Sequence, residues 1–212
     1  MRKTFLMATA AIGFGATAAA AQGPSAVRLR LEPGSEVTVE GTSTMHAYHC
    51  ATNKIMAYVD VDPGYTNDLT KIAKPIVSVK VNIVVNTLKC GNGTMDKNLY
   101  STLDADKNPL ISYTLSGYDI LNGLSSSFAA NTKGSLKISG TEKLIDMKVN
   151  ASRLAEGKVT AEGEQTLLMT DFGIKPPSFM LGTLKVGNEV KVKFNLKAGP
   201  EMVAQLTAAT QQ

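Results

Sequence analysis

The sequence has no tryptophan, and its aromatic residues make up 6% of the 212 residues. It contains no Gly-x-Ser-x-Gly motif and no glycine-rich phosphate loop, and its acidic residues are scattered rather than paired. These absences leave no positive case for an enzyme or for a cofactor. Lysine and arginine form no cluster interleaved with aromatic residues, so nucleic-acid binding is not predicted.

Histidine is almost as scarce, since His46 and His49 are the only two in the chain. On a strand, residues three apart point to opposite faces, so these two rings do not converge on one ion. Cys50 is adjacent, but further ligands of the usual zinc type are not evident, and we predict no metal site. A hydrolase or isomerase that uses His46 remains a minor alternative, because Ser43 and His46 have no evident third partner.

The first residues are typical of a secretory signal peptide. Arg2 and Lys3 precede an apolar, alanine-rich run, and a small-residue cleavage site ends near Ala21. We therefore predict a signal peptide over residues 1–21, a mature domain over 22–198, and a short tail or weak helix over 199–212. Removal of the two basic residues lowers the formal charge from +4 to +2. The product is expected to be periplasmic or secreted, with no later segment long enough to cross a membrane.

The two cysteines, Cys50 and Cys90, form an even number in a chain that is expected to be exported. An oxidising compartment favours a disulfide between them, and two free buried thiols are the alternative. A bond that closes a loop of about 40 residues would stabilise the fold by roughly 4 kcal/mol in the chain-entropy model.

Most of the chain alternates apolar and polar residues with period two, which predicts strands with one wet face. Loops are expected at residues 63–74, 122–132 and 171–182 because these segments are rich in small, polar or proline residues. Short connections favour antiparallel neighbours, and both a barrel and a two-sheet sandwich fit the pattern. The eight or nine predicted strands lie within residues 27–31, 37–41, 55–62, 77–86, 111–116, 136–138, 145–149, 159–169 and 190–196.

Residues 94–106 differ from the rest because their apolar side chains recur every four positions. This spacing predicts a single amphipathic helix, with Thr94 as its N-cap and Pro109 beyond its end. Its apolar face consists of Met95, Leu99 and Leu103. A lone helix among strands must cover something, and we expect it to close one end of a β-barrel that holds an apolar ligand.

The predicted inward faces of the strands are mostly valine, isoleucine, leucine and methionine. Such linings suit a flexible hydrocarbon because they offer apolar contact without requiring one shape. The same residues could equally pack against each other as an ordinary core. The pattern leaves these two interpretations open.

Several segments resemble the YceI-like family. Residues 41–46 read Gly-Thr-Ser-Thr-Met-His and resemble that family's G-x-S-T-x-H segment. The helix-to-strand segment from Met95 to Ile111 and the Gly-Ser-Leu-Lys-Ile-Ser-Gly-Thr hairpin at 134–141 are similar to family segments too. So are the Asp-Phe-Gly-Ile loop at 171–174 and the Val-Gly-Asn-Glu-Val strand at 186–190. The order of these matches is the family's order.

The resemblance implies an all-β fold, an eight-stranded antiparallel lipocalin-like barrel with one α-helix near its mouth. It also implies a cavity that binds a polyisoprenoid or another long-chain amphiphile in the periplasm, without known catalysis. The sequence departs from the family at Ala47, where relatives often have an acid, and in its two cysteines. If the acid contacts a polar head group in relatives, that contact is absent here.

The favoured hypothesis is therefore a carrier for a long apolar lipid such as an isoprenoid quinone or a polyprenyl compound. Met95, Leu99 and Leu103 are expected to cap the cavity, and His46 to be either a polar contact near the mouth or a structural hydrogen-bonder in a turn. The candidate lining residues are Met45, Tyr113, Phe172, Met180 and Phe194. The alternative is an envelope adhesion or interaction domain with a filled core that binds through residues 67–74 or 125–131. The oligomeric state stays open, including a homodimer.

Overall fold

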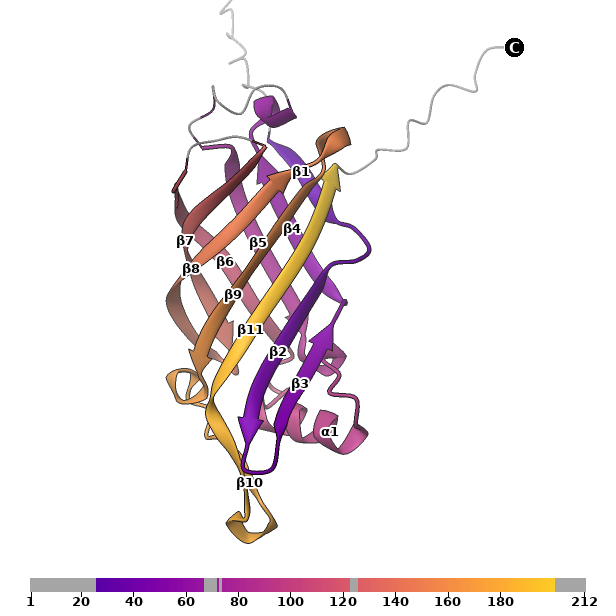
Figure 1. The fold of residues 1–212 in the computed structure, drawn as a ribbon, viewed down its shortest axis with the longest axis vertical. Helices are drawn as coiled ribbons and strands as arrows, with labels where there is room; N and C mark the ends of the chain where they lie inside the picture. Colours follow the sequence, from indigo (N-terminus) through magenta and orange to yellow (C-terminus); the bar gives the residue numbers. More distant parts are fainter. Residues whose placement is uncertain (1–25, 67–71, 73, 123–125, 201–212) are drawn as a thin grey trace, which may run out of the picture.

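The computed structural model describes residues 26–66, 72, 74–122 and 126–200. The predicted signal peptide and residues 201–212 lie outside these. The described chain is almost entirely strand, with one α-helix, α1 (Gly93–Thr102), at one end (Figure 1). The strands are β1 (Val27–Leu31), β2 (Glu36–Ser43), β3 (Ala47–Thr52), β4 (Ile55–Val61), β5 (Ile76–Val84), β6 (Leu110–Ile120), β7 (Ser127–Ile138), β8 (Thr141–Arg153), β9 (Val159–Leu168), β10 (Ser178–Phe179) and β11 (Leu184–Pro200).

The sheet closes into a barrel because β1 pairs antiparallel with both β4 and β11. Going round the ring from β1, the order is β4, β5, β6, β7, β8, β9 and β11, and β11 returns to β1. The predicted eight-stranded antiparallel barrel is thus confirmed. Closure leaves no free edge along the ring, which removes a site at which another chain could add a strand.

The hairpin of β2 and β3 extends one part of the barrel wall toward α1. β2 pairs with β11 next to β1, and Val37 faces Phe194 in that pairing. β3 in turn pairs with β2, and β4 follows it after two residues. The outer edge of β3 meets the segment that leads into the helix, since Ala51 of β3 forms an isolated bridge with Lys89. The helix therefore lies next to β3, at this end of the barrel.

Strand β3 was not predicted from the sequence, and the boundaries of β7 and of the helix differ from the prediction. The turn expected over 122–132 is too long, because β7 begins at Ser127 and pairs with β8 along its whole length. The main-chain ladder with β8 overrides the weak strand preference of the small polar residues there. The helix begins and ends earlier than expected, and Asn92 rather than Thr94 is the N-cap, since its side chain accepts hydrogen bonds from the main-chain N–H groups of Thr94 and Met95.

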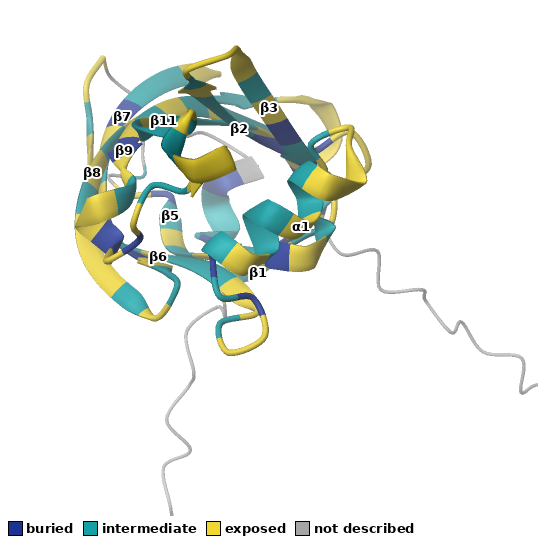
Figure 2. Ribbon diagram, turned by 90° about the horizontal axis from the view of Figure 1, so that it is seen from below, coloured by how far each residue is buried: buried dark blue, intermediate teal, exposed yellow. Residues whose placement is uncertain are grey.

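Two buried clusters lie at opposite ends of the barrel. The first, the α1-end core, comprises Val85, Leu88, Leu103, Ala105, Leu136, Leu167, Phe172 and Ile174. The second, the η1-end core, comprises Leu29, Val61, Tyr65 and Ala198, and is named after the 3-10 turn η1 (Pro63–Thr66) that supplies Tyr65. Figure 2 views the α1 end, where the helix lies across one side of the barrel. The two cores leave the middle of the barrel between them.

Candidate ligand-binding cavity

A cavity of about 340 Å³ runs through the barrel. Its walls include side chains from every strand of the ring and from α1. Along β8, Ile145, Met147, Val149, Ala151 and Arg153 line the cavity with the period of one strand face, and Ser152 at the end of the strand lines it as well. At about 3.3 Å per residue, that row extends for roughly 26 Å along the strand. The cavity is therefore elongated and follows the barrel from one core toward the other.

Three inward aromatic rings lie flat against the wall, and each lies over a glycine of a neighbouring strand. A Cβ atom placed on any of these glycines would overlap the ring. The pairs are Tyr48 over Gly41, Tyr113 over Gly134, and Phe194 over Gly163. The glycines thus provide room for large side chains at the wall, so that the rings leave the axis of the barrel open.

The lining is almost wholly apolar, with a small number of polar side chains. Tyr113 is the most informative of these, because its hydroxyl is buried beside the Thr132 side chain and makes no hydrogen bond of regular geometry within the described part of the protein. Burial raises the pKa of the Tyr113 phenol, so the group is a neutral donor at physiological pH. A buried hydroxyl that faces a cavity without a partner is placed to bond a polar atom of a bound molecule.

The α1 end of the cavity is closed by a segment that is tied to the wall. The predicted disulfide between Cys50 and Cys90 is confirmed and joins β3 to the approach to α1. Within the helix, the Asp96 carboxylate accepts a 2.7 Å hydrogen bond from the Cys90 main-chain N–H and lies 3.2 Å from the Lys89 ammonium group. The hydroxyl of Tyr100 lies 2.8 Å from the carbonyl oxygen of Leu88. These contacts hold the helix in place as a fixed cap.

At this cap, Asp96 and Lys89 stabilise each other's charged forms. The Cys90 N–H, and then the Lys89 ammonium group, hold the pKa of Asp96 below its usual range. Hydrogen bonds to Tyr100 and Asp96 raise the pKa of Lys89. Both groups therefore keep their charges over the neutral range, and the attachment of α1 persists there.

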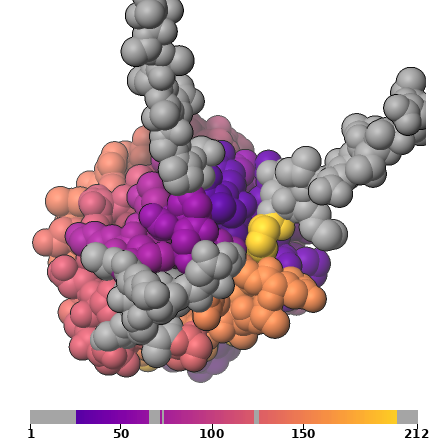
Figure 3. Space-filling model, turned by 90° about the horizontal axis from the view of Figure 1, so that it is seen from above, coloured from indigo at the N-terminus to yellow at the C-terminus, as the bar shows by residue number. Residues whose placement is uncertain are grey.

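The opposite end is held by hydrogen bonds. The hydroxyl of Tyr65 donates to the carbonyl oxygen of Gly157 at 2.6 Å, and Arg153 donates to the carbonyl oxygen of Tyr65 at 3.0 Å. These bonds join η1 to the β8–β9 connection, which contains the 3-10 turn η4 (Ala155–Gly157). Figure 3 shows this end, with the purple residues of η1 beside the orange residues of that connection.

The structure places five of the nine predicted ligand-contact residues on the cavity wall. These are Leu99, Leu103, Tyr113, Phe172 and Phe194. Met95 belongs to α1 but does not line the cavity. The placement of Met45 and Met180 as lining residues is wrong, because each lies in an exposed turn at the end of a hairpin, beyond the barrel wall.

Residue His46 also lies in such a turn, between β2 and β3, and is exposed. Its ring Nδ1 lies 2.8 Å from the carbonyl oxygen of Ala47, and its main-chain carbonyl accepts from the Ser43 hydroxyl at 2.8 Å. The Ser43 hydroxyl is thus engaged by main chain rather than by the imidazole. These contacts fit the structural alternative for His46 better than a ligand contact.

Sequence reasoning missed most of the middle of the wall. The lining residues there that it did not single out include Tyr48, Val81, Leu115, Met147, Val149 and Val192. The available signal was their alternation, which places each on the same strand face as a residue that was identified. The inward direction of Tyr48 depends on its pairing opposite Gly41.

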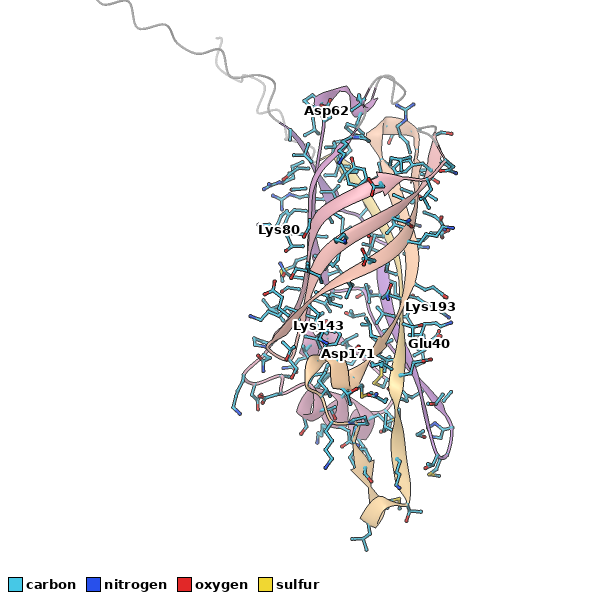
Figure 4. All side chains as sticks on the ribbon, turned by 90° about the vertical axis from the view of Figure 1, so that its left-hand side faces the viewer. Glu40, Asp62, Lys80, Lys143, Asp171 and Lys193 are labelled. Atoms are coloured by element: carbon cyan, nitrogen blue, oxygen red, sulfur yellow. A yellow bond between two sulfur atoms is a disulfide. The ribbon has the colours of Figure 1, made fainter. Side chains whose placement is uncertain are left out.

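The outer wall differs in character from the cavity. Figure 4 shows labelled charged side chains that point outward, among them Lys193 beside Glu40 and Lys143 beside Asp171. The ammonium group of Lys193 lies 2.8 Å from the carboxylate of Glu40, which lowers the pKa of Glu40 and raises that of Lys193.

Within the described residues, no three side chains of the metal-binding types come together. No helix in the same part of the chain is long and apolar enough to cross a membrane.

Comparisons with known proteins agree with this architecture. Residues 31–198 match the YceI-like domain family. BcnA of Burkholderia cenocepacia is similar in structure with a TM-score of 0.62 and 21% identity, covering 77% of this chain and 95% of that one.

Two further solved structures have the same fold. A polyisoprenoid binding domain from Saccharophagus degradans, implicated in plant cell wall breakdown, gives a TM-score of 0.62 at 11% identity, covering 82% of this chain and 99% of that one. The YCEI protein of Campylobacter jejuni gives 0.54 at 16% identity, covering 70% and 82%. A comparison with curated proteins gives no match.

Proposed function

The chain belongs to the YceI-like family, and from this premise we propose that it is a non-catalytic carrier that holds a long-chain apolar lipid inside its barrel. The observation that carries the proposal is the elongated apolar cavity between the two packed cores. Removing a methylene group from water is worth about 0.8 kcal/mol, so a chain of many methylenes gains affinity along the whole row of lining residues.

The shape and chemistry of the cavity favour one flexible chain. A volume of about 340 Å³ lies at the lower end of the roughly 300–1,000 Å³ that ligand sites occupy. Met147 and Met169 are among the lining residues, and their unbranched side chains can adapt to a longer or bulkier ligand. The unpartnered Tyr113 hydroxyl favours a ligand with one hydrogen-bonding group rather than a pure hydrocarbon.

We propose the class of lipid from the family and from one structural neighbour. The Saccharophagus degradans neighbour is described as polyisoprenoid binding, and an isoprenoid quinone or polyprenyl compound fits both requirements of this cavity. The compartment we propose is the periplasm or the cell exterior. The predicted signal peptide and the Cys50–Cys90 disulfide support an oxidising location.

The filled-core alternative has lost its main premise, because the interior is hollow. A protein-interaction role would have to use the outer surface and would leave the cavity without a purpose. We therefore retain the lipid carrier as the proposed function.

Organic extraction and native mass spectrometry of the purified full-length protein test this proposal. We expect a co-purifying lipid, and saturable uptake of a fluorescent lipid probe by delipidated protein. Val149→Phe places an aromatic ring in the cavity and should reduce uptake at least about tenfold. Asn150→Phe is the matched control, since this neighbouring side chain is exposed on the opposite face of β8.

Two results would overturn the proposal. One is a wild-type protein that repeatedly emerges without lipid and takes up no probe. The other is equal uptake by the Val149→Phe variant when its thermal unfolding shows that it is folded.

A further inference from the structure

A narrow hairpin projects beyond the α1 end of the barrel (Figure 1). It is built from β10, the 3-10 turn η6 (Met180–Gly182) and the start of β11. Its turn carries two large apolar side chains in water, since Met180 is 72% exposed and Leu181 is 109% exposed. Apolar side chains that are this exposed side by side are unusual on a protein surface without a binding role.

A second exposed methionine lies beside this hairpin. Met45, which is 68% exposed, occupies the turn between β2 and β3. The main-chain N–H of Thr44 donates to the carbonyl oxygen of Lys185 at 2.9 Å, and the Thr44 hydroxyl donates to the carbonyl oxygen of Thr183 at 3.1 Å. The β2–β3 turn is thus hydrogen-bonded to the base of the hairpin, at the start of β11, and the hairpin turn lies beyond it (Figure 1). We call Met45, Met180 and Leu181 the apolar tip.

The backbone of the tip is held in an unfavourable conformation. Met180 and Leu181 have φ angles of 51° and 55°, in the left-handed region that bulky residues rarely adopt. Gly182 follows with a φ of 91°, which glycine adopts at little cost. A tight hairpin turn requires positive φ angles, which glycine or asparagine usually supplies, so two bulky apolar residues in this turn are unusual and suggest a functional role.

The charged residues within the two segments that form the tip are all basic. In the two segments that form it, residues 42–46 and 175–186, the charged residues are Lys175 and Lys185, and neither segment contains an acid. Apolar side chains flanked by lysines match the surface of an anionic bilayer, which takes apolar groups into its acyl region and attracts cations at its head groups.

A second copy of the chain fits this surface less well. A two-fold contact at the tip would bring the same lysines of both copies together. Three side chains at the end of a hairpin also present much less than the roughly 1,000 Å² that a stable protein interface buries.

We propose that the apolar tip inserts into the surface of an anionic lipid bilayer and docks the barrel with its α1 end toward the membrane. The docking proposal rests on the apolar tip alone. A role of docking in lipid transfer rests, in addition, on the lipid carrier function proposed above. In this orientation the end of the cavity that is capped by Leu99 and Leu103 faces the bilayer.

Co-sedimentation with vesicles tests the proposal, using phosphatidylcholine vesicles with and without phosphatidylglycerol. Met180→Ser/Leu181→Ser should lower the partition onto phosphatidylglycerol-containing vesicles at least about tenfold. Lys185→Gln should lower it about fivefold, and only when phosphatidylglycerol is present. The control, Leu121→Ser/Leu154→Ser, removes two exposed leucines that follow the ends of β6 and β8 at the η1 end and should bind like wild type.

Three outcomes would overturn the docking proposal: no vesicle binding by wild type, equal binding by the tip variant, or a wild-type dimer in ultracentrifugation that the tip substitutions convert to a monomer. Lipid extraction from the same variants separates the two proposals. A tip variant that keeps its cargo but loses vesicle binding supports docking, whereas an empty barrel that still binds vesicles through its tip contradicts only the carrier function.

Discussion

The two ends of the barrel and its middle are built from the same kinds of residue but packed differently. At the α1 end Val85 is almost completely buried, and at the η1 end Leu29 is too, and neither side chain lines the cavity. In the middle, equally apolar residues such as Leu115 and Val192 face a cavity. The difference shows how an apolar interior can supply both stability and a binding site, because close packing at the ends leaves the middle free to remain hollow.

The two ends also differ from each other. The α1 end combines its buried core with a disulfide and a network of hydrogen bonds around Asp96. The η1 end is closed by its core together with the hydrogen bonds of Tyr65 and Arg153. Substitutions at the ends should therefore change the free energy of unfolding, and substitutions in the middle should change binding.

The largest effect is expected from removing the covalent tie at the α1 end. Cys50→Ser/Cys90→Ser should lower the free energy of unfolding by about 4 kcal/mol in urea denaturation, because the unfolded chain gains entropy. Tyr65→Phe at the η1 end removes one hydrogen bond and should cost only about 1 kcal/mol. Equal unfolding midpoints for the cysteine variant and wild type, or two titratable thiols in unreduced, denatured wild type, would contradict the prediction.

A matched pair of leucine substitutions compares an end with the middle directly. Leu29→Ala at the η1 end should lower the free energy of unfolding by about 3 kcal/mol, since Leu29 is fully buried and does not line the cavity, so that its truncation creates a void in a packed core. Leu115→Ala should cost roughly 1 kcal/mol, because its side chain already faces a cavity and no new void is formed. Chemical denaturation measures both. Similar losses for the two variants would mean that the middle is packed like the ends.

A glycine substitution tests how the middle stays open. Gly134→Ala places a methyl group where the Tyr113 ring lies, so the ring must move into the cavity. We expect uptake of a fluorescent lipid probe to weaken about tenfold, which is about 1.4 kcal/mol. Gly117→Ala is the control, because a Cβ atom there meets nothing within 4 Å. Unchanged uptake by the Gly134→Ala variant would show that the flat ring does not determine the size of the cavity.

Two tyrosines allow a finer test of polar recognition. Tyr113→Phe removes a hydroxyl that bonds nothing in the described protein, so stability should not fall, while binding of a lipid with a polar group should weaken by about 1 kcal/mol. Tyr118→Phe leaves the Ile76 N–H without its 2.9 Å acceptor and should cost stability instead. Calorimetric titration and denaturation together separate the two outcomes. A stability loss in Tyr113→Phe with unchanged binding would reverse the assignment.

The smallest effect concerns acid. The Cys90 N–H lowers the folded-state pKa of Asp96, so the carboxylate stabilises the fold above the unfolded-state pKa of about 3.9. That contribution is lost as the pH falls through the lower, folded-state value. Asp96→Asn should therefore reduce the difference in Tm between pH ~6 and pH ~2. Parallel Tm curves for wild type and variant would show that this contact contributes nothing.

Much of the fold followed from the sequence because its signals are local. Alternation predicted the strands, the four-residue spacing of Met95, Leu99 and Leu103 predicted the helix, and an even number of cysteines predicted the disulfide. The start of the helix was less well predicted, because the side chains of Asn92 and Thr94 can both cap a helix. Which of them does so depends on the backbone conformation of the residues after Cys90. Most of β7 was missed, since only residues 136–138 were predicted as strand, because its pairing with β8 depends on register rather than on composition. Strand β3 was not predicted.

The candidate site was predictable in part. Leu99, Leu103, Tyr113, Phe172 and Phe194 line the cavity as expected. Met45 and Met180 were assigned to the interior because methionine is apolar, yet both lie in the turns of hairpins that extend past the barrel. A turn residue has no fixed place in the inward and outward alternation, so its sequence neighbours do not reveal where it points.

The sequence by itself determined the amphipathic strands, the single helix and the pair of cysteines that can join it to the wall. Only the tertiary structure decided that the barrel is hollow, and that the β2–β3 turn is hydrogen-bonded to the base of the hairpin that carries Met180 and Leu181. The physical reason is that alternation specifies which face of a strand is apolar, whereas the space between facing strands depends on closure and register. Gly134 leaves room for Tyr113, and Gly163 for Phe194, only because register places them on neighbouring strands.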